Sequence, residues 1–231
     1  MPSCLPKQWQ ALGSGHRLRM LGELYYFRSR GILDTLAVSC PHRTSLLRGA
    51  GFDAFNVSLG YSREFGQDLG LERDIDVLFL GKLHSRRRRK IIQKVQEDLQ
   101  KYNIKLTIFD GREKYLSDRT QYLNRVKILL NIVQSPGDWT SHRFLLGMAN
   151  KALVITEPVP NLGPYKRNHH LIETPVEEMA QKISFYLEHD EERNKIVETA
   201  YQIIQSEITM AQMCKQILDR VKEQPPHKIY K

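Results

Sequence analysis

The sequence predicts an α/β protein built on a doubly wound parallel sheet. Three short apolar segments, at residues 75–80, 126–132 and 152–155, have the continuous Val/Ile/Leu content of strands that are covered on both faces. Segments with helical spacing of apolar residues separate them, as in chains whose parallel strands alternate with crossover helices. Binding residues are therefore expected where these strands end, since open α/β sheets hold ligands at the carboxyl ends of their strands.

The elements before residue 60 are predicted to be short. We expect a helix around residues 18–25 that ends near Gly31, a strand at 36–38, a helix that begins at Pro41 and closes at residues 49–51, and a half-buried strand at 55–59. Residues 60–72 contain few large apolar side chains and are predicted to form a linker.

From residue 75 the pattern becomes regular. The expected strands are 75–80, 106–109, 126–132, 152–155 and 171–172. The first expected helices are residues 92–102, a polar segment that ends near residue 125, and a short helix capped by Thr140 or Ser141. Two more are expected near the end of the chain, at 176–187 and as one long amphipathic stretch at 196–221. A common order for such a sheet places the first strand beside the fourth, which would bring the loops after residues 80 and 155 together across a crevice.

Composition favours a globular, cytoplasmic protein with reduced thiols. Hydrophobic residues make up 41% of the chain and charged residues 26%, and no apolar segment approaches the about 18 residues that cross a membrane. No secretory signal is evident near Met1. Cys4, Cys40 and Cys214 are far apart, odd in number and without metal-ligand spacing.

The formal charge of +9 raises the question of a nucleic-acid partner, but the charge pattern favours a smaller anion. Consecutive helical residues point in different directions around the axis, so the run 86–90 presents no basic stripe. No aromatic residues alternate with this run. His142, His169 and His170 lack the companion ligands of a metal site, so no metal is expected.

The residues that suit an anionic ligand follow the predicted strands. His142 and Arg143 fall in the first turn of a helix, where backbone N–H groups lack partners and bind anions readily. Gly81 would let the backbone approach a pyrophosphate closely. The full set of candidate donor-binding residues is Gly81, Lys82, Arg86, Asn131, Arg143 and Glu157.

Structural readings of the same residues remain open. The run 86–90 suits a solvated helix face, Asn131 suits a cap for its own loop, and Glu157 suits a turn before Pro158.

These segments resemble the C-terminal half of two-domain glycosyltransferases of the GT-B type, and within them the CgeB-like group with "glycosyl transferases group 1" C-terminal domains. The residues that carry the resemblance are 58–65, 74–81, 126–132, 142–158 and 187–193, within a similarity that covers about residues 36–221. The resemblance implies a Rossmann-like domain that binds a nucleotide-diphosphate sugar as donor substrate, with no cofactor or metal. It divides the chain into a remnant of an N-terminal domain plus linker (1–72), a nucleotide-sugar-binding domain (73–222) and a tail (223–231).

Two positions depart from the pattern of these enzymes. Leu146 stands where related enzymes often carry a ribose-binding glutamate, and Lys151 stands where a glycine commonly precedes the buried strand.

Two hypotheses about function follow. The first is a glycosyltransferase that transfers a sugar to an acceptor the sequence does not identify, with Lys82, Arg86 and Arg143 neutralising the leaving phosphates and Glu157 meeting the ribose or the sugar. Its general base would come from an N-terminal domain, supplied by a partner chain or a longer parent protein, so no catalytic residue is assigned. The second is a non-catalytic nucleotide-sugar-binding or protein-interaction module of the same fold.

Overall fold

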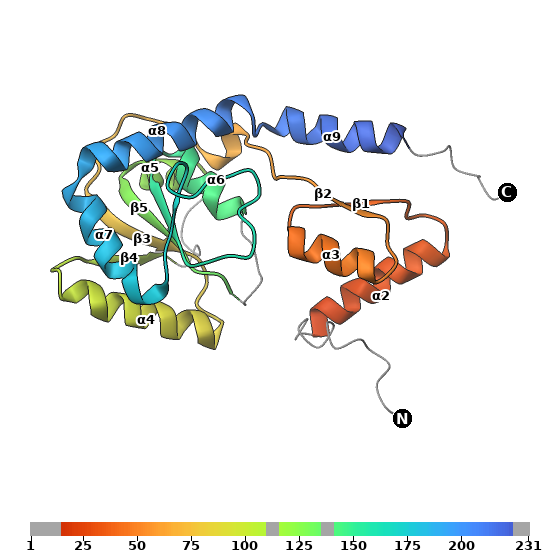
Figure 1. The fold of residues 1–231 in the computed structure, drawn as a ribbon, viewed down its shortest axis with the longest axis horizontal. Helices are drawn as coiled ribbons and strands as arrows, with labels where there is room; N and C mark the ends of the chain where they lie inside the picture. The colour runs from red at the N-terminus through yellow and green to blue at the C-terminus, as the bar shows by residue number, and fades with distance from the viewer. Residues whose placement is uncertain (1–14, 110–115, 135–140, 224–231) are drawn as a thin grey trace. The chain divides into compact units, whose positions relative to one another are not determined.

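The computed structural model describes residues 15–109, 116–134 and 141–223. The chain divides into two compact units, residues 1–57 and residues 58–231 (Figure 1). The predicted tail beyond Glu223 and the predicted cap Thr140 lie outside the described residues.

The described residues of the first unit, 15–57, form two helices and a pair of parallel strands. Its elements are α2 (Gly15–Ser29), β1 (Leu36–Val38), α3 (Pro41–Gly49) and β2 (Ala54–Asn56). Pro41 opens α3, where its missing N–H costs nothing because the first helical N–H groups have no partner in any case. Phe52 is buried, and its ring lies 4.9 Å from that of Tyr25 in α2. The predicted strand at 36–38 and the helix beginning at Pro41 are confirmed.

The second unit is built on a five-stranded parallel sheet in the order β4-β3-β5-β6-β7. The strands are β3 (Ile75–Leu80), β4 (Leu106–Phe109), β5 (Val126–Asn131), β6 (Leu153–Thr156) and β7 (Ile172–Glu173). The doubly wound fold is therefore confirmed. The predicted neighbours were wrong, because the first strand of this sheet pairs with the third and not with the fourth. After β4 the chain passes to the other side of β3, so the sheet reverses its winding between β3 and β5.

Helices cover both faces of this sheet (Figure 1). The described helices of this unit are α4 (Arg86–Gln100), α5 (Leu116–Asn124), α6 (Ser141–Ala149), α7 (Met179–Glu188), α8 (Asp190–Ser206) and α9 (Met210–Lys222), with short 3-10 turns η1 (Arg63–Phe65) and η2 (Val176–Glu178). The last helix, α9, extends away from the sheet, and none of its residues is buried (Figure 1). One apolar cluster joins α4 and α7 to the sheet, and another joins α5 and α6 to its opposite side. No helix in the described part of the chain is long and apolar enough to cross a membrane.

The long helical stretch predicted at 196–221 is in fact two helices, α8 and α9. Thr209 caps α9 in a reciprocal pair of hydrogen bonds with Gln212, which satisfies helix N–H groups that would otherwise lack partners. Tyr61 fixes the break, because its N–H donates to Ile208 O at 2.6 Å and its carbonyl accepts from Met210 N at 2.8 Å. The Thr-x-x-Gln pattern is visible in the sequence, so this boundary was predictable.

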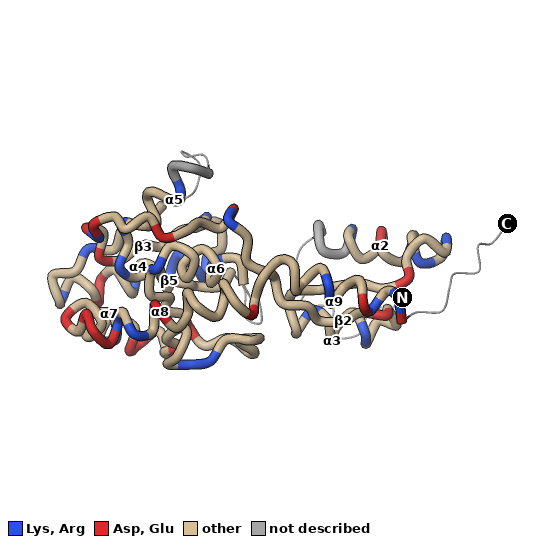
Figure 2. Tube along the Cα trace, turned by 90° about the horizontal axis from the view of Figure 1, so that it is seen from above, with Lys and Arg blue, Asp and Glu red and all other residues tan. Residues whose placement is uncertain are grey.

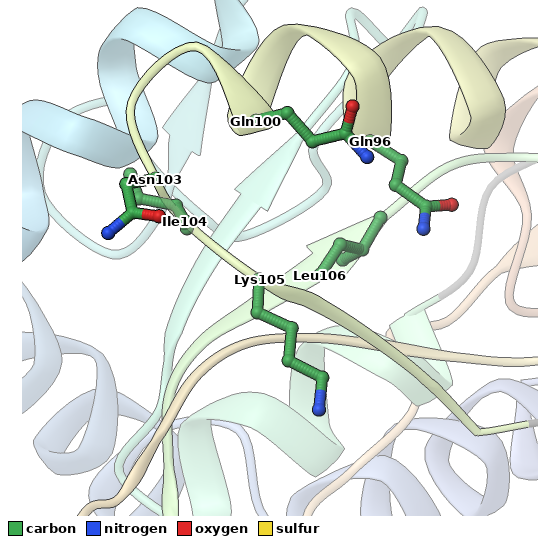
Figure 3. Close-up of a pocket in the computed structure, with 6 residues that line it drawn as sticks. All are labelled: Gln96, Gln100, Asn103, Ile104, Lys105 and Leu106. Atoms are coloured by element: carbon green, nitrogen blue, oxygen red, sulfur yellow. The ribbon is translucent and has the colours of Figure 1, made fainter.

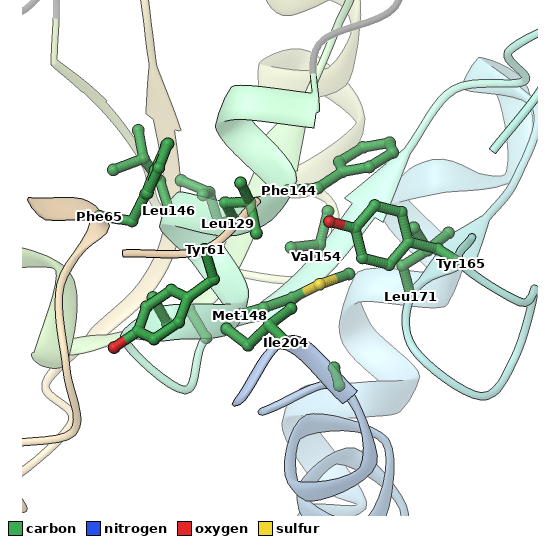
Figure 4. Packing of buried hydrophobic residues seen from close by; sticks show 14 of the residues in the cluster. Tyr61, Phe65, Leu129, Phe144, Leu146, Met148, Val154, Tyr165, Leu171 and Ile204 are labelled. Carbon is green, nitrogen blue, oxygen red and sulfur yellow. The ribbon is translucent and has the colours of Figure 1, made fainter. Parts of the chain in front are cut away.

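The predicted linker packs against the second unit. Tyr61 and Phe65 are buried in the cluster with α6 (Figure 4). Asn150 Nδ2 donates to Phe65 O at 3.0 Å, and Asn124 Oδ1 accepts from Leu69 N at 2.7 Å. These two buried amides also bond to each other at 2.9 Å. These contacts join residues 60–72 to the compact second unit, which covers residues 58–231.

Candidate functional site

Gly81 marks the carboxyl end of β3, beside the point where the sheet reverses. Its φ of 153° lies in a region that favours glycine. A Cβ atom at this position would lie 3.0 Å from Nη2 of Arg143. The backbone after β3 therefore passes close to a guanidinium group, and the absent side chain keeps that approach open.

Arg143 projects from the first turn of α6 across the ends of β3 and β5. Its Nε donates to Leu80 O at 3.0 Å, and its Nη1 donates to Asn131 Oδ1 and, at 3.5 Å, to Ile132 O. The residue is 9% exposed, and within the described residues it forms no ion pair with a carboxylate. It is thus a buried cation held by neutral oxygen atoms.

The electrostatic surroundings of Arg143 favour an anion. The guanidinium lies 5.4 Å from the centre of the Phe79 ring, and the guanidinium of Arg88 lies 5.7 Å from the same ring. Burial, with the charge of Arg88 nearby, lowers the pKa of Arg143 to about 9. Because arginine keeps its proton near neutral pH, this lowered pKa indicates a cation that a bound anion would stabilise.

Glu157 lies at the same edge of the sheet, but its carboxylate already binds protein groups. Arg87 Nη1 donates to Oε1 at 3.0 Å, Arg87 Nη2 pairs with Oε2, and Val133 N donates to Oε1 at 2.7 Å. The glutamate is 3% exposed. It therefore joins the start of α4 to the loops after β5 and β6.

The other predicted site residues divide between the rim and the interior. Lys82 and Arg86 are exposed. Asn131 is fully buried, accepts from Arg143, and donates to Thr156 Oγ1 at 2.8 Å. It positions the arginine and links β5 to β6.

The sequence reasoning missed Arg87 and Arg88, because the basic run was weighed as one solvated face. That reading is wrong for these two residues. Arg88 is buried and donates to Lys82 O at 3.0 Å, whereas Arg86 is exposed. Figure 2 marks in blue where basic residues stand along the backbone. The signal was present, since Arg88 stands four residues before Ile92 on the apolar face of α4.

Two surface hollows in the described part of the chain lie elsewhere. One, of about 290 Å³, borders the end of α4 and the start of β4, and includes Gln96, Gln100 and Asn103 (Figure 3). The other, of about 420 Å³, lies in the loop 160–167 after β6. No group of three or more His, Cys, Asp or Glu side chains with metal-binding geometry occurs among the described residues.

Comparison with known proteins identifies the family. The profile of a family described as glycosyl transferase-like matches residues 86–219, more than half of the chain. The chain belongs to this family. No curated protein sequence matches this glycosyl transferase-like chain significantly.

Solved structures of GT-B glycosyltransferases share its fold. TarM has a TM-score of 0.68 at 14% identity, over 86% of this chain and 45% of TarM. HepE of Anabaena, solved with UDP and glucose, has a TM-score of 0.68 at 12% identity, over 95% of this chain and 70% of HepE. Sucrose-phosphate synthase of Thermosynechococcus elongatus has a TM-score of 0.61 at 13% identity, over 92% of this chain and 62% of the synthase chain.

These comparisons confirm the predicted GT-B resemblance and the Rossmann-like fold. The chain spans about half the length of TarM. Assignment to the CgeB-like group stays a prediction.

Proposed function

We propose that the chain binds the diphosphate of a nucleotide-diphosphate sugar at the carboxyl ends of β3 and β5, as the donor-binding part of a GT-B glycosyltransferase. The observation that supports this most is Arg143, a buried cation with no carboxylate partner among the described residues. A buried charge is costly unless it is paired, so the arrangement favours a ligand that supplies the missing negative charge.

The chemistry of sugar transfer matches this arrangement. As the bond between the sugar and the diphosphate breaks, negative charge grows on the departing phosphate, and preorganised cations stabilise it. Arg143 is held rigidly by Leu80, Asn131 and Ile132, so it needs no reorganisation during the reaction. The exposed Lys82 and Arg86 supply further positive charge at the rim.

Glu157 remains our candidate for contact with the ribose or the sugar. An ionised carboxylate offers about four acceptor positions, and three hydrogen bonds from Arg87 and Val133 occupy it here. One position is left for a hydroxyl group. Leu146 is buried in the apolar cluster, so it takes no part in polar recognition.

We also propose that no metal or cofactor is required and that the chain acts in the cytoplasm. A partner chain or a further domain would supply the general base and the other side of the donor-binding crevice. The TarM, HepE and sucrose-phosphate synthase chains are all longer than the part this chain matches, which supports the need for such a second domain.

Calorimetry with UDP, GDP and dTDP and their sugars tests the proposal. We expect at least one of these ligands to bind, and Arg143→Met to weaken that binding about ten- to a hundredfold, because a hydrogen bond to a charged group contributes about 1.5–3 kcal/mol. The matched control is Arg125→Met, which removes an arginine paired with Asp74 at the opposite edge of the sheet. The control should bind as the wild type does.

Two results would contradict the proposal: no binding of any ligand in the panel, or equal binding by wild type and Arg143→Met. Loss of the buried charge should not unfold Arg143→Met, and its thermal unfolding is measured alongside.

The departure at Leu146 favours the second candidate function, a non-catalytic binding module. Measurable sugar transfer by the chain would exclude that candidate.

A further inference from the structure

Phe65, Arg119 and His142 form a second basic cluster beside Arg143, entirely within residues 58–231. The rings of Phe65 and His142 meet edge to face, with centroids 5.1 Å apart. Arg119, in α5, donates through Nη2 to Glu64 O, immediately before Phe65. Residues from η1, α5 and the start of α6 therefore converge on one place.

The positive charge of the cluster is that of Arg119, which forms no salt bridge with a carboxylate among the described residues. Within the same residues its Nε is buried without a hydrogen-bond partner. Burial lowers the pKa of Arg119, and the charge of Glu64 partly offsets this. Arg119 thus resembles Arg143 in having no salt-bridge partner in the part of the chain that the structure describes.

His142 is the exposed member of the cluster. Burial of part of its ring lowers the pKa of His142, and the charges of Arg119 on α5 and Arg143 on α6 lower it further. Phe65, which packs on it from η1, carries no charge. The imidazole is consequently mainly neutral near pH 7, and an anion bound beside it would favour its protonated form.

We propose that Arg119 and His142, supported by Phe65, form a second phosphate-binding subsite next to the one at Arg143. The ligand group is a phosphate ester, carried either by the acceptor or by the donor. This inference rests on the proposed function for the identity of the neighbouring ligand, but the subsite itself is defined by its own three residues.

The placement at the sheet edge supports this assignment. In the parallel sheet α5 follows the carboxyl end of β4, and α6 follows the carboxyl end of β5. The first turns of both helices thus lie at the edge where Gly81 ends β3. A phosphate group held here would lie beside the proposed donor site and not on a remote surface.

Binding of a phosphate group at this subsite should depend on pH, because it is linked to the uptake of a proton by His142. An anion beside His142 favours the charged imidazolium, so binding raises its pKa and takes up a proton. Affinity should therefore increase as the pH falls through the raised pKa of the complex. A purely structural histidine would show no such dependence.

The experiment follows the histidine ring signals by NMR in the full-length chain, with dimethyl phosphate as the probe. A phosphate diester does not titrate near neutral pH, so any pH dependence belongs to the protein. His142→Gln identifies the signal of His142. We expect the probe to raise the pKa of His142 and to bind several-fold more tightly near pH 5.5 than near pH 7.5. Arg119→Gln should abolish this response, and the control His42→Gln should preserve it.

A second arm distinguishes the two sources of phosphate. If the probe still raises the pKa of His142 when UDP saturates the protein, the subsite takes a phosphate of the acceptor. If UDP alone raises that pKa and blocks the probe, the subsite takes a phosphate of the donor. The proposal is overturned if neither ligand changes the pKa of His142, or if Arg119→Gln responds like the wild type.

The same samples separate this inference from the proposed function. Arg143→Met should bind UDP about ten- to a hundredfold more weakly, the outcome that tests the donor site, while its His142 still responds to dimethyl phosphate. A chain that binds no nucleotide but shows the histidine response would contradict only the donor proposal.

Discussion

Lys151 occupies a left-handed position that closes helix α6, and replacing it separates two opposing contributions to stability. Its φ is 52°, and two backbone hydrogen bonds, from Ala152 N to Gly147 O at 2.9 Å and from Lys151 N to Met148 O at 3.2 Å, close the helix end around it. A residue with a side chain in this conformation costs about 1 kcal/mol or slightly more relative to glycine.

The side chain of Lys151 offsets that cost. Its Nζ lies 2.7 Å from a carboxylate oxygen of Glu198 and 3.1 Å from one of Asp68, and 5.0 Å from the centre of the Tyr201 ring. Burial lowers the pKa of Lys151, but hydrogen bonds to Glu198 and Asp68 outweigh it and raise the pKa overall. Asp68 and Glu198 are both exposed, so each of the two ion pairs contributes about 0.2–1 kcal/mol.

The two contributions predict different outcomes for two substitutions. Lys151→Gly relieves the backbone strain and loses the side-chain contacts, so its free energy of unfolding should stay within about 1 kcal/mol of the wild type. Lys151→Ala loses the contacts and keeps the strain, so it should be less stable than Lys151→Gly by about 1 kcal/mol.

Urea unfolding of the full-length variants, followed by circular dichroism, measures the difference. The comparison between glycine and alanine isolates the backbone contribution, because both variants lack the ammonium group. An alanine variant as stable as the glycine variant would refute the reasoning. High salt should lower the stability of the wild type relative to Lys151→Gly, since salt screens ion pairs that the glycine variant lacks.

Two further substitutions test the contacts that shape the second unit. Gly66→Ala should destabilise it by more than about 2 kcal/mol, because the new Cβ would lie 2.3 Å from the side-chain amide of Asn150 and φ is 125°. The control Gly70→Ala also has a positive φ, 63°, but open space around it, and should cost less in the same urea titration. Glu157→Gln should lower the free energy of unfolding by about 1–2 kcal/mol, a value reduced by solvent because the Arg87 side chain is 34% exposed. An unchanged midpoint would show that this ion pair contributes nothing.

The candidate site was predictable where a residue acts through its own type and its place in a strand or helix. Gly81 follows an apolar strand, and Arg143 opens a helix that follows another, so both were expected at the carboxyl edge of the sheet. The two residues are close in the structure for that reason. Arg87 was missed because its partner, Glu157, is 70 residues away along the chain, and no local pattern indicates that pairing.

The sequence by itself determined the elements and their class. A strand covered on both faces must be apolar throughout, and this requirement alone located β3, β5 and β6 within a residue or two. Only the tertiary structure decided which strands are neighbours, because parallel strands of similar composition pair equally well in several orders. That choice in turn placed Asn131 between β3 and β6, and so set which oxygen atoms hold the buried charge of Arg143.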